Sequence, residues 1–488
     1  MKTATLAVLA SIIAATNGID LHRRTDGPAR VVSMATERRK IGNPVQRDRL
    51  RRRTVTVAAN LDNEETLYFV NATLGTPAQT LRLHIDTGSS DLWVNTPSSE
   101  LCKDPSDPCT FAGTYSANAS STYAYVGSYF NISYVDGSGA SGDYVTDTFT
   151  IGSGSNASAA TLSTLQFGIG YSSSSSQGIL GIGYAINEVQ VGRAGKAAYP
   201  NLPAQMVADG LIQSNSYSLW LNDLDADTGN MLFGGVDTAR YSGSLQTLPV
   251  QKQAGVYSEF LITLTGLQLG SATLASDMAL AVLLDTGSSL TYLPDPIVET
   301  IYNEVGATYD ADEGAAYVPC SLADRANASV TFKFSHPSTI TVDADELVLD
   351  LVTASGRRPT FRNGQDACLF GIAPAGRGTN VLGDTFLRSA YVVYDLDNNQ
   401  ISMAQTVFNT TASSVVEIGA GTSAVPDATL VADAVAATAG LILVGGSSSR
   451  GGSSDASSGS AGSPIHGALA IVTALAVSTM GGMGLFLI

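Results

Sequence analysis

The pentapeptide Asp-Thr-Gly-Ser-Ser occurs twice in this chain of 488 residues, at positions 86–90 and 285–289. Both copies lie between apolar runs: residues 83–94 read LHIDTGSSDLWV and residues 282–293 read VLLDTGSSLTYL. A single copy would be an ordinary turn at the end of a strand. The two aspartates are 199 positions apart, which is far too long for a solenoid repeat and predicts two similar lobes, each contributing one copy.

Paired carboxylates explain why such a motif would be needed twice. Two carboxylates held close together cannot both ionise easily, so they share a proton, and the apparent pKa values belong to the pair. One member can then activate a water molecule while the other protonates a carbonyl oxygen. Asp86 and Asp285 are therefore the candidate catalytic residues of a hydrolase.

Several further segments agree with this interpretation, and together they resemble the pepsin-like aspartic proteases from about Leu67 to Val407. The resemblance implies an all-β, bilobal pepsin-like fold with two similar lobes around a central cleft. A substrate peptide of roughly six to eight residues would lie extended in that cleft. The matching segments are residues 66–81 (first hairpin), 131–149 (flap), 178–183 and 381–404 (paired hydrophobic-Gly segments behind the aspartates) and 229–250 (near the lobe junction).

The resemblance also implies roles for individual residues. Thr87 and Thr286 would hydrogen-bond across the lobe interface, Gly88 and Gly287 would permit a tight turn and close backbone approach, and Ser89 and Ser288 would donate to the outer carboxylate oxygens.

Tyr134 matches the flap tyrosine, whose phenol would hydrogen-bond to Trp93, and VDGSG follows it as a tight-turn sequence. Asp136, Gly137 and Ser138 belong to this flap, and Val135 departs from the glycine that many family members have there.

The charge is distributed unevenly along the chain. Residues 19–53 hold 11 basic and 4 acidic residues, whereas residues 54–488 hold 14 basic and 39 acidic residues, a net charge of −25. So acidic a body would repel phosphate, which argues against a nucleic-acid partner. The sequence lacks HExxH and has only four histidines, so metalloprotease and serine-hydrolase chemistry are not supported. Neither a metal nor an organic cofactor is expected.

The N-terminus is expected to direct secretion. Residues 1–18 have the pattern of a signal peptide: Lys2, an apolar core and a small-residue cleavage region. Residues 19–53 read as a basic propeptide that ends in RDRLRRR. The family resemblance implies that its positive groups pair with the catalytic carboxylates. The lobes are then expected at 54–245 and 246–408.

The C-terminus is expected to anchor the protein. Residues 409–463 read as a Ser/Gly/Ala-rich stalk, although the apolar section 434–444 could instead dock on the body. The apolar tail 464–488 and its polar spacer match a glycosylphosphatidylinositol signal better than a spanning helix, with Asp455 as a guess for the attachment residue.

Four cysteines allow three pairings. We expect Cys102–Cys109, which would clamp a loop near the cleft entrance, and Cys320–Cys368; the resemblance implies the same pairing. N-glycosylation acceptors occur at Asn71, Asn118, Asn131, Asn156, Asn327 and Asn409.

These features together resemble the yapsin group of surface-anchored fungal proteases. The expected protein is a monomeric endopeptidase, on the plasma membrane or in the cell wall, that takes peptide substrates and binds pepstatin-type inhibitors. A preference for basic residues would fit Asp91, Asp136 and the acidic loop with Glu100, Asp104 and Asp107. The alternatives are a broad-specificity acid protease and a non-catalytic wall glycoprotein.

Overall fold

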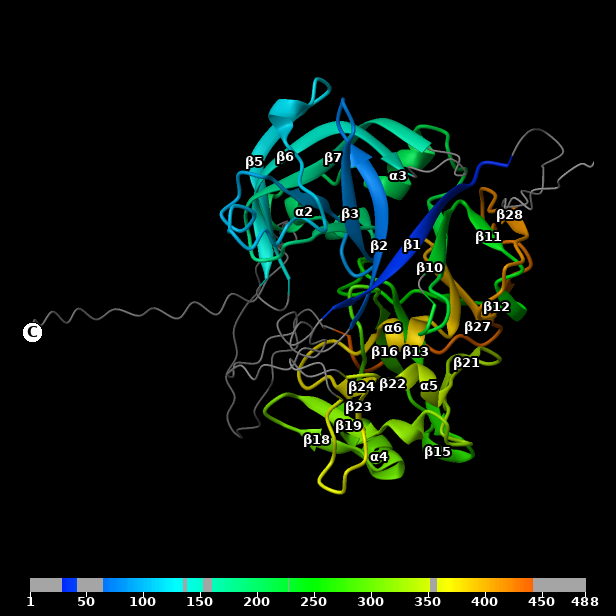
Figure 1. Cartoon of the computed structure of the whole chain (residues 1–488). Coiled ribbons are helices and arrows are strands. Elements are labelled where there is room, and N and C mark those ends of the chain that lie inside the picture. The colour runs from blue at the N-terminus through cyan, green and yellow to red at the C-terminus, as the bar shows by residue number, and fades with distance from the viewer. Residues whose placement is uncertain are drawn as a thin grey trace, which may run out of the picture. The chain divides into compact units, whose positions relative to one another are not determined.

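The computed structural model describes residues 29–41, 65–134, 138–151, 160–226, 228–351 and 358–441, with the backbone alone at 39–41, 65 and 66. All of them belong to one compact unit that ends at Leu443. Strands dominate this part of the chain, and the all-β, bilobal prediction is confirmed (Figure 1). None of the helices in these ranges is long and apolar enough to cross a membrane.

The largest sheet has 14 strands and includes strands from both halves of the chain. In spatial order it consists of β29 (Thr429–Leu430), β12 (Tyr241–Pro249), β27 (Gln400–Thr406), β26 (Ala390–Asp395), β9 (Ser216–Trp220), β10 (Thr228–Phe233), β1 (Val32–Ile41), β2 (Glu65–Leu74), β3 (Gln79–Asp86), β8 (Gly178–Gly181), β4 (Leu92–Asn95), β7 (Ala160–Ser173), β6 (Gly139–Ile151) and β5 (Ala124–Ser133).

The C-terminal lobe adds three smaller sheets, and a two-stranded ribbon pairs β11 (Gly235–Asp237) with β28 (Val415–Glu417). The three sheets are β13 (Leu261–Leu264), β16 (Leu280–Leu284), β25 (Val381–Leu382), β17 (Thr291–Leu293) and β24 (Ile372–Pro374); β15 (Ala272–Ala275), β14 (Gly266–Leu269), β20 (Val330–Lys333) and β21 (Thr339–Val342); and β18 (Thr308–Asp310), β19 (Ala315–Pro319), β23 (Ala367–Phe370) and β22 (Val348–Leu349).

The described helices are short. They are α2 (Val189–Ala194), α3 (Leu202–Ala208), α4 (Asp295–Val305), α5 (Ala344–Leu347) and α6 (Asp384–Leu387), with 3-10 turns η1 (Ala117–Ala119), η2 (Ala185–Asn187) and η3 (Cys320–Leu322).

Strand β16 shows how an apolar run positions a motif. All five of its side chains are buried, as expected for a strand covered on both faces. Strand β25 runs parallel to it, with Leu283 opposite Val381. Strand β8 runs parallel to β3 in the same way, with Asp86 opposite Gly181. The segments predicted to lie behind the two aspartates therefore do lie there.

Part of the predicted propeptide is a strand of the large sheet. β1 pairs antiparallel with β10 on one side and with β2 on the other (Figure 1). Its alternate residues Val32, Met34 and Thr36 are buried, as the two-residue period of a strand requires. Arg38 donates to the backbone carbonyl of Asp223 at 3.4 Å. Apart from Arg30, the other basic side chains of residues 19–53 lie outside the described residues, so the implied pairing of the propeptide with the catalytic carboxylates stays a prediction. The basic run 47–53 lies outside the described residues.

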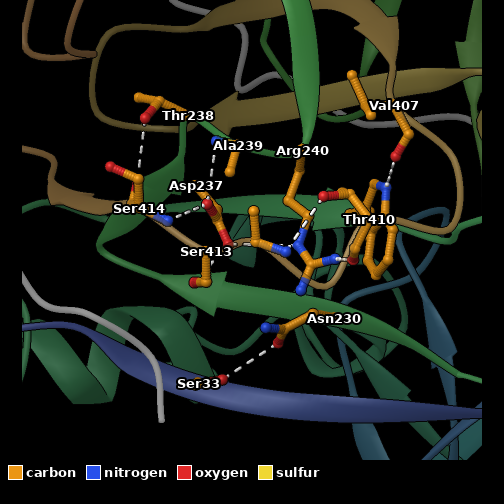
Figure 2. Close-up of polar contacts among 12 residues, drawn as sticks. Ser33, Asn230, Asp237, Thr238, Ala239, Arg240, Val407, Thr410, Ser413 and Ser414 are labelled. Carbon is orange, nitrogen blue, oxygen red and sulfur yellow. Dashed lines mark hydrogen bonds and ion pairs between the residues drawn. The ribbon is translucent and has the colours of Figure 1, made fainter. Parts of the chain in front are cut away.

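Much of the segment predicted as a stalk packs on the body. Residues after Val407 add β28 and β29 to the sheets, and Val415, Ile418, Val425 and Val431 are buried. Figure 2 shows one attachment: Asp237 accepts hydrogen bonds from the Ser413 hydroxyl at 2.8 Å and from the Ser414 N–H at 2.7 Å. The section 434–444, which the sequence left open, also contacts the body as far as it is described, to residue 441. The Thr438 N–H donates to the Ala279 carbonyl and the Ala281 N–H donates to the Ala439 carbonyl, both at 2.8 Å, while most side chains of residues 434–441 stay exposed.

Candidate active site

The two motifs lie at the ends of equivalent strands. Asp86 is the last residue of β3, and Asp285 directly follows β16. Both side chains are largely buried, with 2% and 8% of their surface exposed. The fold therefore brings together the two carboxyl groups that the sequence predicted as a pair.

Each aspartate is held by its own motif in the same way. The N–H of the glycine two positions on donates to Oδ1, and the hydroxyl of the serine three positions on donates to Oδ2. The four bonds are Gly88 to Asp86 at 2.9 Å, Ser89 to Asp86 at 2.7 Å, Gly287 to Asp285 at 2.8 Å and Ser288 to Asp285 at 2.7 Å. Such bonds stabilise an ionised carboxylate and fix its orientation.

The two threonines join the motifs reciprocally. The Thr87 N–H donates to Oγ1 of Thr286, and the Thr286 N–H donates to Oγ1 of Thr87, both at 3.1 Å. The hydroxyls then donate onward to the opposite strands: Thr87 to the Leu284 carbonyl at 2.9 Å and Thr286 to the Ile85 carbonyl at 3.0 Å. Both threonines are buried, so this network fixes the spacing of the aspartates.

Glycine is required at two positions where another segment of the site passes close to the backbone. An added Cβ at Gly88 would collide with the Asp285 carboxylate. An added Cβ at Gly383 would collide with the carbonyl oxygens of Ser288 and Leu290. No side chain fits at either position, so the sequence requirement for glycine is steric.

An aromatic layer is buried in the same region. The Tyr217 and Tyr394 rings stack with centroids 4.9 Å apart, and Phe260 packs edge-on to Tyr394 at 4.7 Å. Burial raises the pKa of both tyrosines well above the ordinary range, and the Asp86 charge adds to the effect on Tyr217. Both therefore remain neutral and give the region a low dielectric, which strengthens the interactions of the carboxylates.

The flap is a hairpin of β5 and β6, with Ser133 opposite Gly139. The Tyr134 hydroxyl accepts a hydrogen bond from Nε1 of Trp93 at 2.7 Å, and the Tyr134 N–H donates to the Ser138 carbonyl at 2.8 Å. The structure thus brings Tyr134, Trp93 and Ser138 together as the sequence suggested. Val135, Asp136 and Gly137 lie outside the described residues.

Asp91 differs from the expectation. Only 1% of its surface is exposed, and it accepts hydrogen bonds from the Tyr144 and Tyr199 hydroxyls, at 2.5 and 3.0 Å, and from the Val189 N–H at 2.8 Å. Burial raises the pKa of its carboxyl. A side chain enclosed in this way cannot contact a substrate, so Asp91 does not contribute to a basic-residue preference by direct pairing.

Two further carboxyl groups were missed at the sequence level. Glu188 is buried beside Asp91 and accepts the Tyr199 N–H at 2.8 Å; burial raises its pKa to about 9. Glu259 lies on the segment next to β16, and its pKa is raised by burial and by the charge of Asp285. Neither belongs to a motif, and only the tertiary contacts reveal them.

Both disulfides form in the expected pairing. Cys102–Cys109 has a Cα–Cα distance of 5.3 Å, and Cys320–Cys368 has one of 5.0 Å. Within the described part of the chain, Cys320, Cys368 and Asp350 lie close enough to share a metal ion, but the disulfide removes the thiolates that would bind it.

The glycosylation acceptors differ in accessibility. Asn118, Asn131, Asn327 and Asn409 are exposed. Asn71 is half-buried and donates to Oε1 of Glu37 at 2.7 Å. Asn156 and the suggested anchor residue Asp455 lie outside the described residues.

Comparison with known proteins identifies the class. A model of the eukaryotic aspartyl protease family matches residues 67–406, and the chain belongs to this family. The probable aspartic-type endopeptidase opsB of Aspergillus oryzae is 60% identical over 427 residues, or 86% of this chain and 85% of that protein. Candidapepsin-3 of Candida albicans is 38% identical over 373 residues, or 74% of this chain and 85% of that protein.

A solved structure shares the fold. The aspartic proteinase from Irpex lacteus aligns with a TM-score of 0.56 and 22% identity, covering 78% of this chain and 100% of that one. Family membership and the names of the relatives together make the protein an aspartic-type endopeptidase, a hydrolase.

Proposed function

We propose that Asp86 and Asp285 are the catalytic dyad and hydrolyse peptide bonds through a shared proton. The observation that carries this proposal is the matched set of hydrogen bonds to the two carboxylates, joined by the reciprocal Thr87–Thr286 pair. One carboxylate takes a proton from water, the water oxygen attacks the peptide carbonyl carbon, and the other carboxyl protonates the carbonyl oxygen. The first carboxyl then gives the proton it took from water to the amide nitrogen, while the second takes a proton back from a hydroxyl of the tetrahedral intermediate; the C–N bond breaks and releases the amine and the carboxylic acid.

The flap is proposed to close over the bound peptide. The Trp93–Tyr134 hydrogen bond of 2.7 Å orients the phenol at the base of the hairpin tip. Closure would exclude water other than the attacking molecule and hold the peptide extended.

We further propose that the protein is secreted, made as a zymogen, anchored at the cell surface and selective for basic residues. The signal-like residues 1–18, the basic segment 19–53 and the apolar tail 464–488 support this. The net charge of −25 over residues 54–488 favours cationic peptides by long-range attraction. The alternative is a broad-specificity acid protease with the same dyad.

Peptide hydrolysis from pH 3 to 7 tests the proposal. The full chain is produced in a secretory host and allowed to process, then assayed with and without a pepstatin-type inhibitor. Asp285→Asn should lower kcat by about a thousandfold or more while the protein still folds. Normal activity in that variant would contradict the dyad, and equal rates for Lys, Arg and Leu at the cut bond would favour the broad-specificity alternative.

A further inference from the structure

The segment that precedes β13 lies along the strand that ends at Asp285. In the antiparallel pair of β13 and β16, Leu261 is opposite Leu283. The contact extends one residue further, because the Leu284 N–H donates to the Phe260 carbonyl at 3.2 Å. The next residues along the two segments are Glu259 and Asp285. The chain bends at Glu259, and its carboxyl is close enough to Asp285 for the charge of that residue to act on it.

A small hairpin holds the Glu259 side chain in place. Gln253 and Val256 exchange two backbone hydrogen bonds of 2.9 Å, and Ala254 and Gly255 between them have positive φ angles of 50° and 85°, as in the tight turns that close hairpins. At the base of this hairpin, Nε2 of Gln253 donates to Oε2 of Glu259 at 2.5 Å. The carboxyl group is thus oriented by a neutral partner.

The carboxyl of Glu259 retains capacity for a cation. The side chain is partly exposed, and among the described residues no ion pair involves it and no hydrogen bond reaches its Oε1. The nearby Lys252 places its Nζ over the Tyr257 ring instead, 4.9 Å from the centroid. Burial raises the pKa of Glu259, and the negative charge of Asp285 adds to the effect.

We propose that Glu259 is a specificity-determining residue that binds a Lys or Arg side chain of the substrate next to the scissile bond. A cationic side chain there would pair with Oε1 and relieve the repulsion between Glu259 and Asp285. An apolar side chain would leave Oε1 of Glu259 without a partner, and an acidic side chain would add a like charge. The inference rests on the proposed dyad function and gives the basic-residue preference a structural origin that Asp91 does not supply.

The test compares the processed full chain with Glu259→Gln and Glu259→Lys on matched peptides. The peptides differ only by Lys, Leu or Glu at one of the positions flanking the cut bond. Glu299→Gln is the control, since Glu299 is exposed on α4 and its substitution changes the net charge by the same amount as Glu259→Gln. Cleavage of the Leu peptide shows that the protein is folded and the dyad active, and the ratio of kcat/KM for Lys to that for Leu measures the effect of Glu259 on specificity.

We expect the wild-type chain and Glu299→Gln to prefer Lys by about tenfold at one position. Glu259→Gln should bring the ratio close to one while still cleaving the Leu peptide, and Glu259→Lys should prefer Glu. An unchanged ratio in Glu259→Gln would overturn the inference and leave the proposed function intact. Absence of any Lys preference in the wild type, or of a Glu preference in Glu259→Lys, would also overturn it. Loss of all cleavage, wild type included, would refute the dyad proposal itself.

Discussion

The Asp285 carboxylate lies directly against the α-carbon of Gly88. A Cβ built at Gly88 would be 2.6 Å from Oδ1 of Asp285 and 2.9 Å from its Cγ. The N–H of the same glycine donates to Oδ1 of Asp86 at 2.9 Å. One residue of the first motif therefore contacts both aspartates, and its missing side chain allows the carboxyl groups to approach each other.

Gly88→Ala should separate the aspartates. The added methyl group must displace the Asp285 carboxylate, and a misplacement of about 1 Å in a catalytic group can cost a hundredfold in rate. We expect kcat to fall by about that factor, measured with a peptide whose cleavage a pepstatin-type inhibitor blocks. Gly192→Ala is the matched control, because a Cβ there meets nothing within 4 Å; equal losses in both variants would contradict the steric explanation.

Thr286→Val should loosen the junction between the motifs. Valine has nearly the same shape but neither donates to the Ile85 carbonyl nor accepts the Thr87 N–H, which leaves buried groups unsatisfied. The free energy of unfolding should fall by about 2–4 kcal/mol, as measured by urea denaturation. Thr286→Ser keeps the hydroxyl and should recover most of the loss; a serine variant as unstable as the valine variant would show that the hydroxyl alone does not hold the junction.

The buried pair of Glu188 and Asp91 predicts lower stability at alkaline pH. Burial raises the pKa of Glu188 from its ordinary value of 4.5 to about 9, so the unfolded state releases this proton at lower pH than the folded state. The free energy of unfolding should therefore decrease as the pH rises from about 4.5 to 9, by at most about 1.4 kcal/mol per pH unit for this group. Below pH 4.5, Glu188 is protonated in both states, so this group should add no pH dependence to the free energy of unfolding.

Glu188→Gln provides the check. Glutamine cannot ionise but can still accept the Tyr199 N–H, so the variant should unfold with a flatter pH dependence between 5 and 9. Melting temperatures at several pH values measure this. If the melting temperature of the variant falls with pH as steeply as that of the wild type, the pH dependence must come from other groups.

Removal of the residues after Phe408 should prevent stable folding. The family match ends at residue 406, yet the segment beyond it buries Val415, Ile418, Val425 and Val431. Each such side chain contributes about 1.5–3 kcal/mol when fully buried, and whole domains are stable by only about 5–15 kcal/mol. A chain ended after Leu443 should secrete and melt normally, whereas one ended after Phe408 should not accumulate.

Asp237→Asn tests the same attachment without shortening the chain. The substitution removes the charge that accepts the Ser413 hydroxyl and the Ser414 N–H (Figure 2). It also breaks the ion pair of Asp237 with Arg240, whose guanidinium donates to the Thr410 carbonyl of the same segment. We expect a drop of about 1–3 kcal/mol in the free energy of unfolding, as for other hydrogen bonds to a charged group. Full stability of the shortened chain would show that this segment is dispensable.

The sequence alone was sufficient to predict the fold class and to select Asp86 and Asp285 as a pair. A strand followed by Asp-Thr-Gly is a local pattern, and its repetition in a single chain indicates two lobes without any coordinates. The roles of the glycine, threonine and serine residues around Asp86 and Asp285 came from the family resemblance, and their contacts are made within and between the motifs themselves.

Only the tertiary structure decided which other acidic residues lie beside the catalytic aspartates and which are enclosed. Asp91 adjoins the first motif in sequence, but two tyrosine hydroxyls and a backbone N–H enclose it. Glu259 is 26 positions before Asp285 in sequence and becomes its neighbour through the pairing of β13 with β16. The burial of a side chain and its hydrogen-bond partners depend on contacts between segments that are distant in sequence, and a local sequence pattern cannot predict these contacts.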